Sequence, residues 1–596
     1  MSPSQIIVLA TPVFFALIAI EFVVGLRRGR NTYRFDDALN SISLGMLSQA
    51  SVVFVPLLKI GIYTAVFSSL ALVPDTGFWT TLPGWLLALL FYDFLYYWNH
   101  RLGHTVGVFW AAHVVHHQSQ DYNLSTALRQ PSSYPLLGWV FYLPMALAGV
   151  PPLVFAVVAL IDLLYQFWIH TGQIGSLGRF DRWFASPSNH RVHHAVNDRY
   201  VDKNYGGILM LWDHLFGSFE PEDPNEPCVY GTRSPLNSWD PLWANAEVYT
   251  ALARDSWHTR HWADKLRVWL KPPGWRPADV AAAFPKQPFD ITTVKTYAPP
   301  VTRPVKVFAA WQFVALLGGV AAFLWRADTA GLSHNLAWFT ALFAGLWAMG
   351  ALLQGRITRG EVLLIECAAL SMASAATGWP AVHLIFKPLT MVMALAVVIA
   401  AMRSRADSTL TGPRGASLLL AALAASLAGD VFLMLEGLFI PGLAAFLLAH
   451  LAYIALFRQG VPWLANRPAA WGVAAVGLGM YAVLWFGGLP PGLRGPVAAY
   501  VLAIGLMAAQ ALGRASVQRD GPSLVVAVGA ACFMLSDALL AINRFVSPLP
   551  MSAFWVLGSY YAAQCLMVMG VLRGAAIALK AKRHPPIRAP ERHPDA

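Results

Sequence analysis

Long apolar runs separated by short charged loops make up most of this 596-residue chain. A helix needs ~20 apolar residues to cross a bilayer. Runs near that length predict helices over 5–26, 44–73, 83–98 and 135–170, the last broken by Pro144, Pro151 and Pro152 into a hairpin. A polar stretch covers about 171–305. Ten further helices are predicted at about 307–325, 335–353, 361–378, 380–402, 416–435, 438–457, 468–487, 496–513, 522–543 and 551–573. The pattern predicts an all-α, polytopic integral membrane protein.

Composition agrees with this pattern and excludes one class of partner. Apolar residues make up 57% of the chain and charged residues only 12%. The net charge of +11 could suggest nucleic acid, but the basic residues lie in short loops between apolar runs. That distribution is typical of membrane proteins, so we expect no nucleic-acid partner. The four cysteines share no metal-binding or disulfide spacing.

The loop charges predict an orientation. If 171–305 is cytosolic and the following helices alternate, arginines concentrate in the inner loops, as the positive-inside rule requires. The inner loops hold Arg356, Arg359, Arg403, Arg405, Arg414, Arg458, Arg467, Arg514 and Arg519, and the outer loops hold Arg326, Arg494 and Arg544. Arg27, Arg28, Arg30 and Arg34 likewise place the end of the first helix inside. The polar stretch should therefore lie at the cytosolic membrane surface.

The same pattern predicts the domain organisation. A Pro-rich, charged connector at 254–305 closes a first domain over 1–305. Connecting transmembrane helices follow over 306–359. An eight-helix membrane bundle covers 360–575, and a basic cytosolic tail covers 576–596.

Histidines are the strongest chemical signal in the first domain. Nine of the 17 histidines fall between positions 100 and 194, in the motifs HRLGH, HVVHH and HRVHH with one more between them. Histidines at i, i+3 and i+4 share a helix face, so each motif should direct two or three imidazoles to one point. The predicted ligands are His100, His104, His113, His116, His117, His170, His190, His193 and His194.

Nine imidazoles are too many for one ion and suit a pair. A structural zinc needs only four ligands, so the number favours a catalytic dinuclear centre. All-nitrogen ligation fits iron, zinc, copper or nickel; we favour two iron ions with O2, for oxidation of an unactivated C–H bond. His100 and His170 each close an apolar run, so the centre should meet the head of a lipid.

These motifs resemble the fatty acid hydroxylase/sterol desaturase superfamily of non-haem di-iron enzymes. FWAAHVVHHQSQDYNLSTALRQPS (109–132) and KNYGGILMLWDHLFGSF (203–219) are similar to the alkylglycerol monooxygenase family, with similarity over about 80–220. The resemblance implies oxidation of the ether-linked carbon of alkylglycerols, releasing a fatty aldehyde. It also implies tetrahydrobiopterin as an external reductant, and no cytochrome or flavin segment is visible in the sequence. A separate redox protein is the alternative, because Thr105 stands where animal members carry Glu.

Other polar residues of this domain have candidate roles. Asp93 and Asp162 interrupt apolar runs, where carboxylates are costly. Each is expected either to orient a ligand histidine or to form a helix-packing hydrogen bond. Asp121, Asn123 and Arg129 either meet substrate hydroxyls or belong to a solvated loop.

The second domain has few charges within its helices, so its exceptions are informative. Lys387, Asp430 and Asp537 should all lie in the outer half of the bilayer if the helices alternate. Lys387 would then pair with one aspartate and leave the other as a general acid or base; a purely structural salt bridge is the alternative. His450 is expected to be a packing residue or an indirect contact.

Four segments here resemble the YhhN-type lysoplasmalogenase family, over nearly all of 360–575. They are FKPLTMVMAL (386–395), AGDVFLML (428–435), FLLAHLAYIALF (446–457) and SDALLAINRF (536–545). The resemblance implies hydrolysis of the vinyl-ether bond of lysoplasmalogens, with catalytic Asp430 and Asp537. Both domains thus suggest a bifunctional enzyme that cleaves ether lipids. The alternatives are a sterol, fatty acid or carotenoid hydroxylase or desaturase, and a bundle that only binds lipid or transports it.

Overall fold

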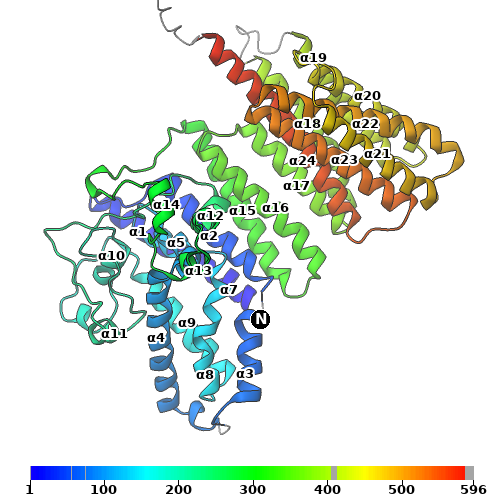
Figure 1. Ribbon diagram of the computed structural model, residues 1–596. Coiled ribbons are helices and arrows are strands. Elements are labelled where there is room, and N and C mark those ends of the chain that lie inside the picture. Colours follow the sequence, from blue (N-terminus) through cyan, green and yellow to red (C-terminus); the bar gives the residue numbers. More distant parts are fainter. Residues whose placement is uncertain (1, 56, 74–75, 404–412, 584–596) are drawn as a thin grey trace, which may run out of the picture. The chain divides into compact units, whose positions relative to one another are not determined.

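The computed structural model describes residues 2–55, 57–73, 76–403 and 413–583, and these residues form helices and turns without a β-strand. The predicted inner loop at 404–412 and the tail from 584 lie outside them. The chain divides into two compact units (Figure 1). The first comprises Met1–Ala330 and Met349–Arg356, and the second Gly331–Ala348 and Ile357–Ala596.

The first unit contains fifteen α-helices among its described residues. They are α1 (Pro3–Arg27), α2 (Phe35–Val52), α3 (Ile62–Leu70), α4 (Leu82–Thr105), α5 (Gly107–His117), α6 (Leu124–Ala127), α7 (Tyr134–Leu137), α8 (Leu143–Leu147), α9 (Pro152–Trp168), α10 (Pro187–His194), α11 (Leu211–Leu215), α12 (Pro241–His258), α13 (Trp262–Leu270), α14 (Ala278–Ala283) and α15 (Arg303–Ala327). Short 3-10 or π-helical turns lie at Leu57–Gly61, Phe78–Thr80, Gly138–Tyr142, Phe180–Arg182 and Ile291–Thr293.

The predicted single helix over 44–73 is wrong. Helix α2 begins earlier, at Phe35, and ends at Val52, and a π-helical turn and α3 follow it. The sequence has a proline at position 56, which disfavours helical geometry in the residue before it. Helix α2 also buries polar side chains: Asn40 donates to Trp239 O at 2.9 Å and Ser48 to Pro131 O at 2.8 Å. It is therefore a helix inside the folded unit.

Helices α3, α4, α8 and α9 pack side by side and carry the apolar part of the histidine domain (Figure 1). The predicted hairpin over 135–170 is present: α7, the turn Gly138–Tyr142 and α8 precede α9. Stacked aromatic rings fill the space between these helices, with centroids 4.7 Å apart for Tyr92 and Tyr142 and 4.1 Å for Tyr63 and Phe155. This rigid core fixes the end of α4, where the first two predicted ligands lie.

The second unit contains the predicted eight-helix bundle. Its helices are α17 (Arg359–Ala376), α18 (Pro380–Arg403), α19 (Pro413–Met434), α20 (Phe439–Phe457), α21 (Arg467–Gly487), α22 (Pro491–Gln518), α23 (Gly521–Phe545) and α24 (Ser552–Arg583), preceded by most of α16 (Leu332–Leu353). Small residues let the helices approach closely, as packing in lipid requires. A Cβ added at Gly429, for example, would lie 2.6 Å from the Phe446 ring.

Ten helices among the described residues are long and apolar enough to cross a membrane. They are α1, α15, α16 and the seven helices from α18 to α24. Besides 44–73, three segments that the sequence predicted as spans are not among the ten: α4 (83–98), the hairpin over 135–170 that ends in α9, and α17 (361–378). The chain is a multi-pass membrane protein.

Candidate functional site

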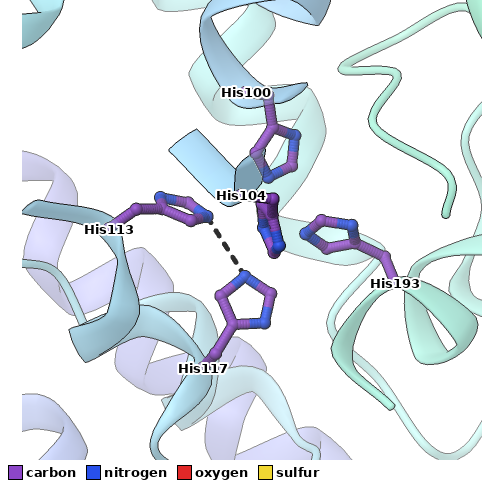
Figure 2. Close-up of side chains that lie close together, drawn as sticks. All are labelled: His100, His104, His113, His117 and His193. Carbon is purple, nitrogen blue, oxygen red and sulfur yellow. Dashed lines mark hydrogen bonds between the residues drawn. The ribbon is translucent and has the colours of Figure 1, made fainter. Parts of the chain in front are cut away.

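The structure brings all nine predicted histidines into two neighbouring groups. His100 and His104 of α4, His113 and His117 of α5, and His193 of α10 form the first group, which we call site 1. Figure 2 shows their imidazole rings converging. The second group, site 2, consists of His116 of α5, His170 after α9, and His190 and His194 of α10. Within each group the candidate ligand atoms all lie within 4.8 Å of one another.

Each HxxHH motif is divided between the two sites, which corrects the expectation that a motif directs all its imidazoles to one point. In HVVHH, His113 and His117 belong to site 1 and His116 to site 2. In HRVHH the arrangement is reciprocal, because His193 belongs to site 1. Residues at i and i+4 lie one above the other on a helix, whereas i+3 and i+4 differ by about 100° around the axis. The motif therefore places two ligands at one site and one at its neighbour.

The two sites adjoin each other. The rings of His117 in site 1 and His194 in site 2 are stacked with centroids 4.3 Å apart. Those of His116 and His194, both in site 2, are 4.7 Å apart. The arrangement suits a dinuclear centre.

The nitrogen positions fit metal ligation. The Nε2 atoms of His100, His104 and His193 are buried without a hydrogen-bond partner. Other pairs of Nε2 atoms face each other directly, at 3.1 Å for His113–His117 and 3.0 Å for His170–His190. Neighbouring ligands around one ion with metal–nitrogen bonds of ~2.1 Å lie about 3 Å apart. Nitrogens arranged in this way could ligate a metal ion between them.

Backbone carbonyls fix the tautomers of four rings. The Nδ1 atoms of these histidines lie 2.7 to 3.0 Å from carbonyl oxygens. The pairs are His100 with Tyr205, His116 with Arg129, His170 with Gln166 and His193 with Lys203. A proton on Nδ1 leaves Nε2 as the free lone pair directed into the site.

Asp213 organises the loop that supplies two of these carbonyls, a role that sequence reasoning missed. Its carboxylate accepts hydrogen bonds from the Tyr205 and Gly206 amides at 2.8 and 2.7 Å, and from Ser218 Oγ at 2.7 Å. Asp213 is fully buried. One feature of the sequence could have indicated this role. Asp213 lies in the segment 203–219, a few residues after Gly206 and Gly207, where a carboxylate can reach back to the loop amides.

The two aspartates expected near the ligands do not contact a histidine. Asp93 accepts hydrogen bonds from the Ile208 amide and Trp212 Nε1, both at 2.8 Å, and so holds the loop above α4. Asp162 accepts from Gln166 Nε2 at 2.5 Å. Asp93 therefore joins α4 to the following loop and α11, as the helix-packing alternative expected, whereas Asp162 bonds a side chain of its own helix, α9. Backbone carbonyl oxygens, rather than these carboxylates, accept from the histidine Nδ1 atoms. Three of the four carbonyls belong to loop residues that lie close to the rings.

The residues considered for substrate hydroxyls have structural partners. Asp121 Oδ1 accepts from Arg34 Nε at 2.8 Å, and Asn123 caps α6. Arg129 is 1% exposed and donates to Val115 O at 2.7 Å and Asn40 Oδ1 at 2.8 Å. The Arg129 side chain thus links α5 to α2, and the Arg129 carbonyl oxygen faces His116 Nδ1. Arg129 therefore helps to position site 2.

Burial keeps the imidazoles neutral. It lowers the pKa of His100 and of His116 to about 4, although their carbonyl partners act in the opposite direction. Near neutral pH these rings therefore carry a lone pair, which is the form that binds a metal ion.

A second polar cluster lies inside the bundle, where the sequence predicted it. Lys387 Nζ lies 3.7 Å from Asp430 Oδ1, so the lysine pairs with one aspartate as expected. Tyr560 also donates to Asp430 Oδ2 at 2.7 Å. Both members of the ion pair are buried.

The other aspartate has different partners. Asp537 Oδ2 accepts from Tyr500 OH at 2.5 Å and lies 3.7 Å from His450 Nε2. His450 is fully buried, with its Nδ1 unpaired and its Nε2 3.0 Å from Tyr500 OH. His450 was expected to be a packing residue or an indirect contact, but it lies directly beside Asp537. Tyr500 and Tyr560 were not identified from the sequence, because tyrosine is common in membrane helices.

Known proteins match the two regions separately. The fatty acid hydroxylase family model matches residues 85–218, and the YhhN family model matches 382–571. The human alkylglycerol monooxygenase is 38% identical over 329 residues, covering 54% of this chain and 72% of that protein. The zebrafish (Danio rerio) alkylglycerol monooxygenase is 34% identical over 369 residues, covering 61% and 81%.

The similarity of the second unit is to shorter proteins. The human lysoplasmalogenase TMEM86B is 36% identical over 156 residues, covering 26% of this chain and 64% of that protein. A lysoplasmalogenase of Mycobacterium bovis is 32% identical over 143 residues, covering 23% and 53%. The chain thus spans less than two thirds of these two relatives. No solved structure matches the chain.

Proposed function

This chain belongs to the alkylglycerol monooxygenase family, and we propose that its first unit oxidises the ether-linked carbon of alkyl glycerolipids. The observation that carries the proposal is the pair of buried imidazole groups at the end of α4. We propose that site 1 and site 2 each hold one iron ion, since nitrogen ligation and oxidation of a C–H bond together favour iron.

The overall reaction balances with one O2 and an external reductant. The ether R–CH2–O–R′, O2, two electrons and two protons give the hemiacetal R–CH(OH)–O–R′ and water. The hemiacetal then collapses to the aldehyde R–CHO and the alcohol HO–R′. When bound, the iron pair would activate O2 for insertion into the C–H bond.

The protein's own residues prepare this reaction by geometry. Carbonyl oxygens keep the Nδ1 atoms of His100 and His193 protonated, so that Nε2 is available in site 1. Eight of the nine histidines are buried and His113 is half-buried, so the centre is largely shielded from water, which protects an oxidising centre from side reactions. Two of the ligands, His100 and His104, lie at the end of α4, whose other end packs in an apolar core, so a lipid can present its ether bond while its chain stays in the membrane.

The electrons come from outside this chain in the proposal. Tetrahydrobiopterin and a separate redox protein are the two candidates. Aldehyde formation by the purified protein with tetrahydrobiopterin alone would identify the pterin. A requirement for an added reductase system would identify the redox protein.

We propose that the second unit hydrolyses the vinyl-ether bond of lysoplasmalogens. The reaction R–CH=CH–O–R′ + H2O gives R–CH2–CHO and HO–R′, so it needs proton transfer but no oxidant. Asp430 is the aspartate that pairs with Lys387, with Nζ 3.7 Å from Oδ1, and we assign it the activation of water. Asp537 lies outside that ion pair and its side chain is 19% exposed, so we assign it the protonation of the double bond.

One experiment separates the two activities. Purified full-length protein is incubated with an alkylglycerol and a reductant, either tetrahydrobiopterin or a reductase system, with and without O2. It is incubated separately with a lysoplasmalogen, and fatty aldehyde is measured in each case. We expect oxygen-dependent aldehyde from the first lipid and oxygen-independent aldehyde from the second. Hydroxylated product without cleavage, from a sterol or fatty acid, would contradict the ether-lipid proposal for the first unit. No aldehyde from any vinyl ether would make the bundle a lipid-binding anchor.

A further inference from the structure

Helix α13 presents its apolar side away from the protein. Trp262, Leu266 and Leu270 recur every four residues and form one face. These side chains are 82%, 71% and 65% exposed, whereas Val268 on the opposite side is 2% exposed. Trp257, at the end of α12, is also 82% exposed. A helix at a water-facing surface has the opposite pattern, with its apolar face towards the core.

This apolar face is held rigidly although little covers it. Lys265 Nζ donates to Ser256 O at 2.8 Å, and Ser256 Oγ donates to Lys265 O at 3.0 Å, which joins α12 to α13. Arg276 makes two hydrogen bonds to the buried Asp255 at 2.7 and 3.2 Å. Exposed aromatic side chains on a fixed scaffold indicate a surface that binds a partner.

Charge identifies the kind of partner. The segment 251–276 contains six Lys and Arg residues and two Asp, a net charge of +4 with neutral histidines. Both aspartates are paired with arginines of the segment, Asp255 with Arg276 and Asp264 with Arg267. The excess positive charge therefore belongs to exposed side chains such as Arg260 and Lys271. Tryptophan, leucine and basic residues together are the composition of helices that lie in an anionic lipid surface.

The depth of α13 also agrees with a lipid surface. The Gly107 amide, two residues after the end of α4, donates to Lys271 O at 2.9 Å. A Cβ at Gly107 would lie 2.9 Å from Val268 O, so the helices are in close contact. The end of α13 is thus fixed at the level where α4 ends, which is also the level of His100 and His104.

We propose that α13 and Trp257 lie in the headgroup region of an anionic leaflet, with the apolar face of α13 towards the acyl chains. The face is defined by Trp262, Leu266 and Leu270. Because α13 packs on the first turn of α5, this contact sets the depth at which the histidine sites meet the bilayer. The inference concerns a lipid surface and does not depend on which reaction the sites perform.

Collision accessibility of a spin label tests the proposal directly. A nitroxide is attached at Leu266→Cys in the full-length chain, with its four native cysteines replaced by alanine, in vesicles of phosphatidylcholine and phosphatidylglycerol. The control carries the label at Ala282→Cys, an exposed position of α14. Melting of both proteins in detergent checks that they are folded; little change is expected, since both positions are exposed.

Oxygen concentrates in the acyl region, whereas a nickel chelate stays in water. We expect the ratio of oxygen to nickel accessibility at position 266 to exceed that at 282 several-fold, and to fall when phosphatidylcholine alone is used. Equal ratios at the two positions would overturn the proposal. Strong spin–spin broadening at 266 would also overturn it, because the face would then contact a second copy of the chain.

Discussion

Replacing Asp213 with asparagine tests how the histidine sites are positioned. The two oxygens of Asp213 accept the Tyr205 and Gly206 amides at 2.8 and 2.7 Å. Asparagine retains one acceptor and places an NH2 group against the other amide. One hydrogen bond to a charged group, worth about 1.5–3 kcal/mol, is lost, and a buried N–H is left without a partner.

The loop that shifts carries the carbonyls facing His100 Nδ1 and His193 Nδ1 at 2.9 and 3.0 Å. Loss of such partners typically weakens metal binding about 10–100-fold. We therefore expect Asp213→Asn to release iron at a chelator concentration lower by about that factor. Alkylglycerol oxidation should fall in parallel with the iron content.

The assay measures iron per folded chain after dialysis against graded chelator concentrations. Asp290→Asn is the matched control, because Asp290 also accepts a backbone amide, at 2.9 Å from Thr292 N, but is exposed on a surface turn. Retention of iron by Asp213→Asn at every concentration that wild type tolerates would refute the positioning role. An equal loss in both variants would show that the substitution acts non-specifically.

Three further predictions address the individual units. His113→Ala or His193→Ala should abolish oxidation of alkylglycerol and leave hydrolysis of lysoplasmalogen unchanged; activity surviving in either variant would contradict the dinuclear assignment. Asp430→Asn and Asp537→Asn should each abolish aldehyde release from lysoplasmalogen without affecting oxidation, whereas a purely structural pair would lower only the melting temperature in detergent. A cysteine probe at Lys203 should react only from the cytosolic side of sealed membranes, and reaction from outside would reverse the predicted topology.

The sequence predicted most of the helices because apolar length alone determines which segments can cross a bilayer. It failed at 44–73, where α2 is apolar enough to resemble a span but buries Asn40 and Ser48 against loops. The partners of those side chains are 83 or more residues away in the chain. Local hydropathy contains no information about such contacts.

The histidine sites show the same division between local and distant information. Spacing within one helix identified eight of the nine members, since ligands at i, i+3 and i+4 are set by helix geometry. His170 belongs to no motif and was predicted because it closes an apolar run between the second and third motifs. Two features depend instead on how α4, α5 and α10 approach each other. One is the division of each motif between two sites, and the other is the contact of the Tyr205 and Lys203 carbonyls with His100 and His193. In the bundle, depth predicted that Lys387 pairs with one aspartate. The choice of Asp430, and the contact of His450 with Asp537, require the packing of the helices against each other.

The central claim is that site 1 and site 2 each hold one iron ion. The most direct test is the iron content of full-length protein purified from iron-replete cells, measured per folded chain together with other transition metals. Nine imidazoles in two groups predict about two iron atoms per chain. One metal ion per chain, or a full complement of zinc with no iron in a preparation that oxidises alkylglycerol, would contradict the claim.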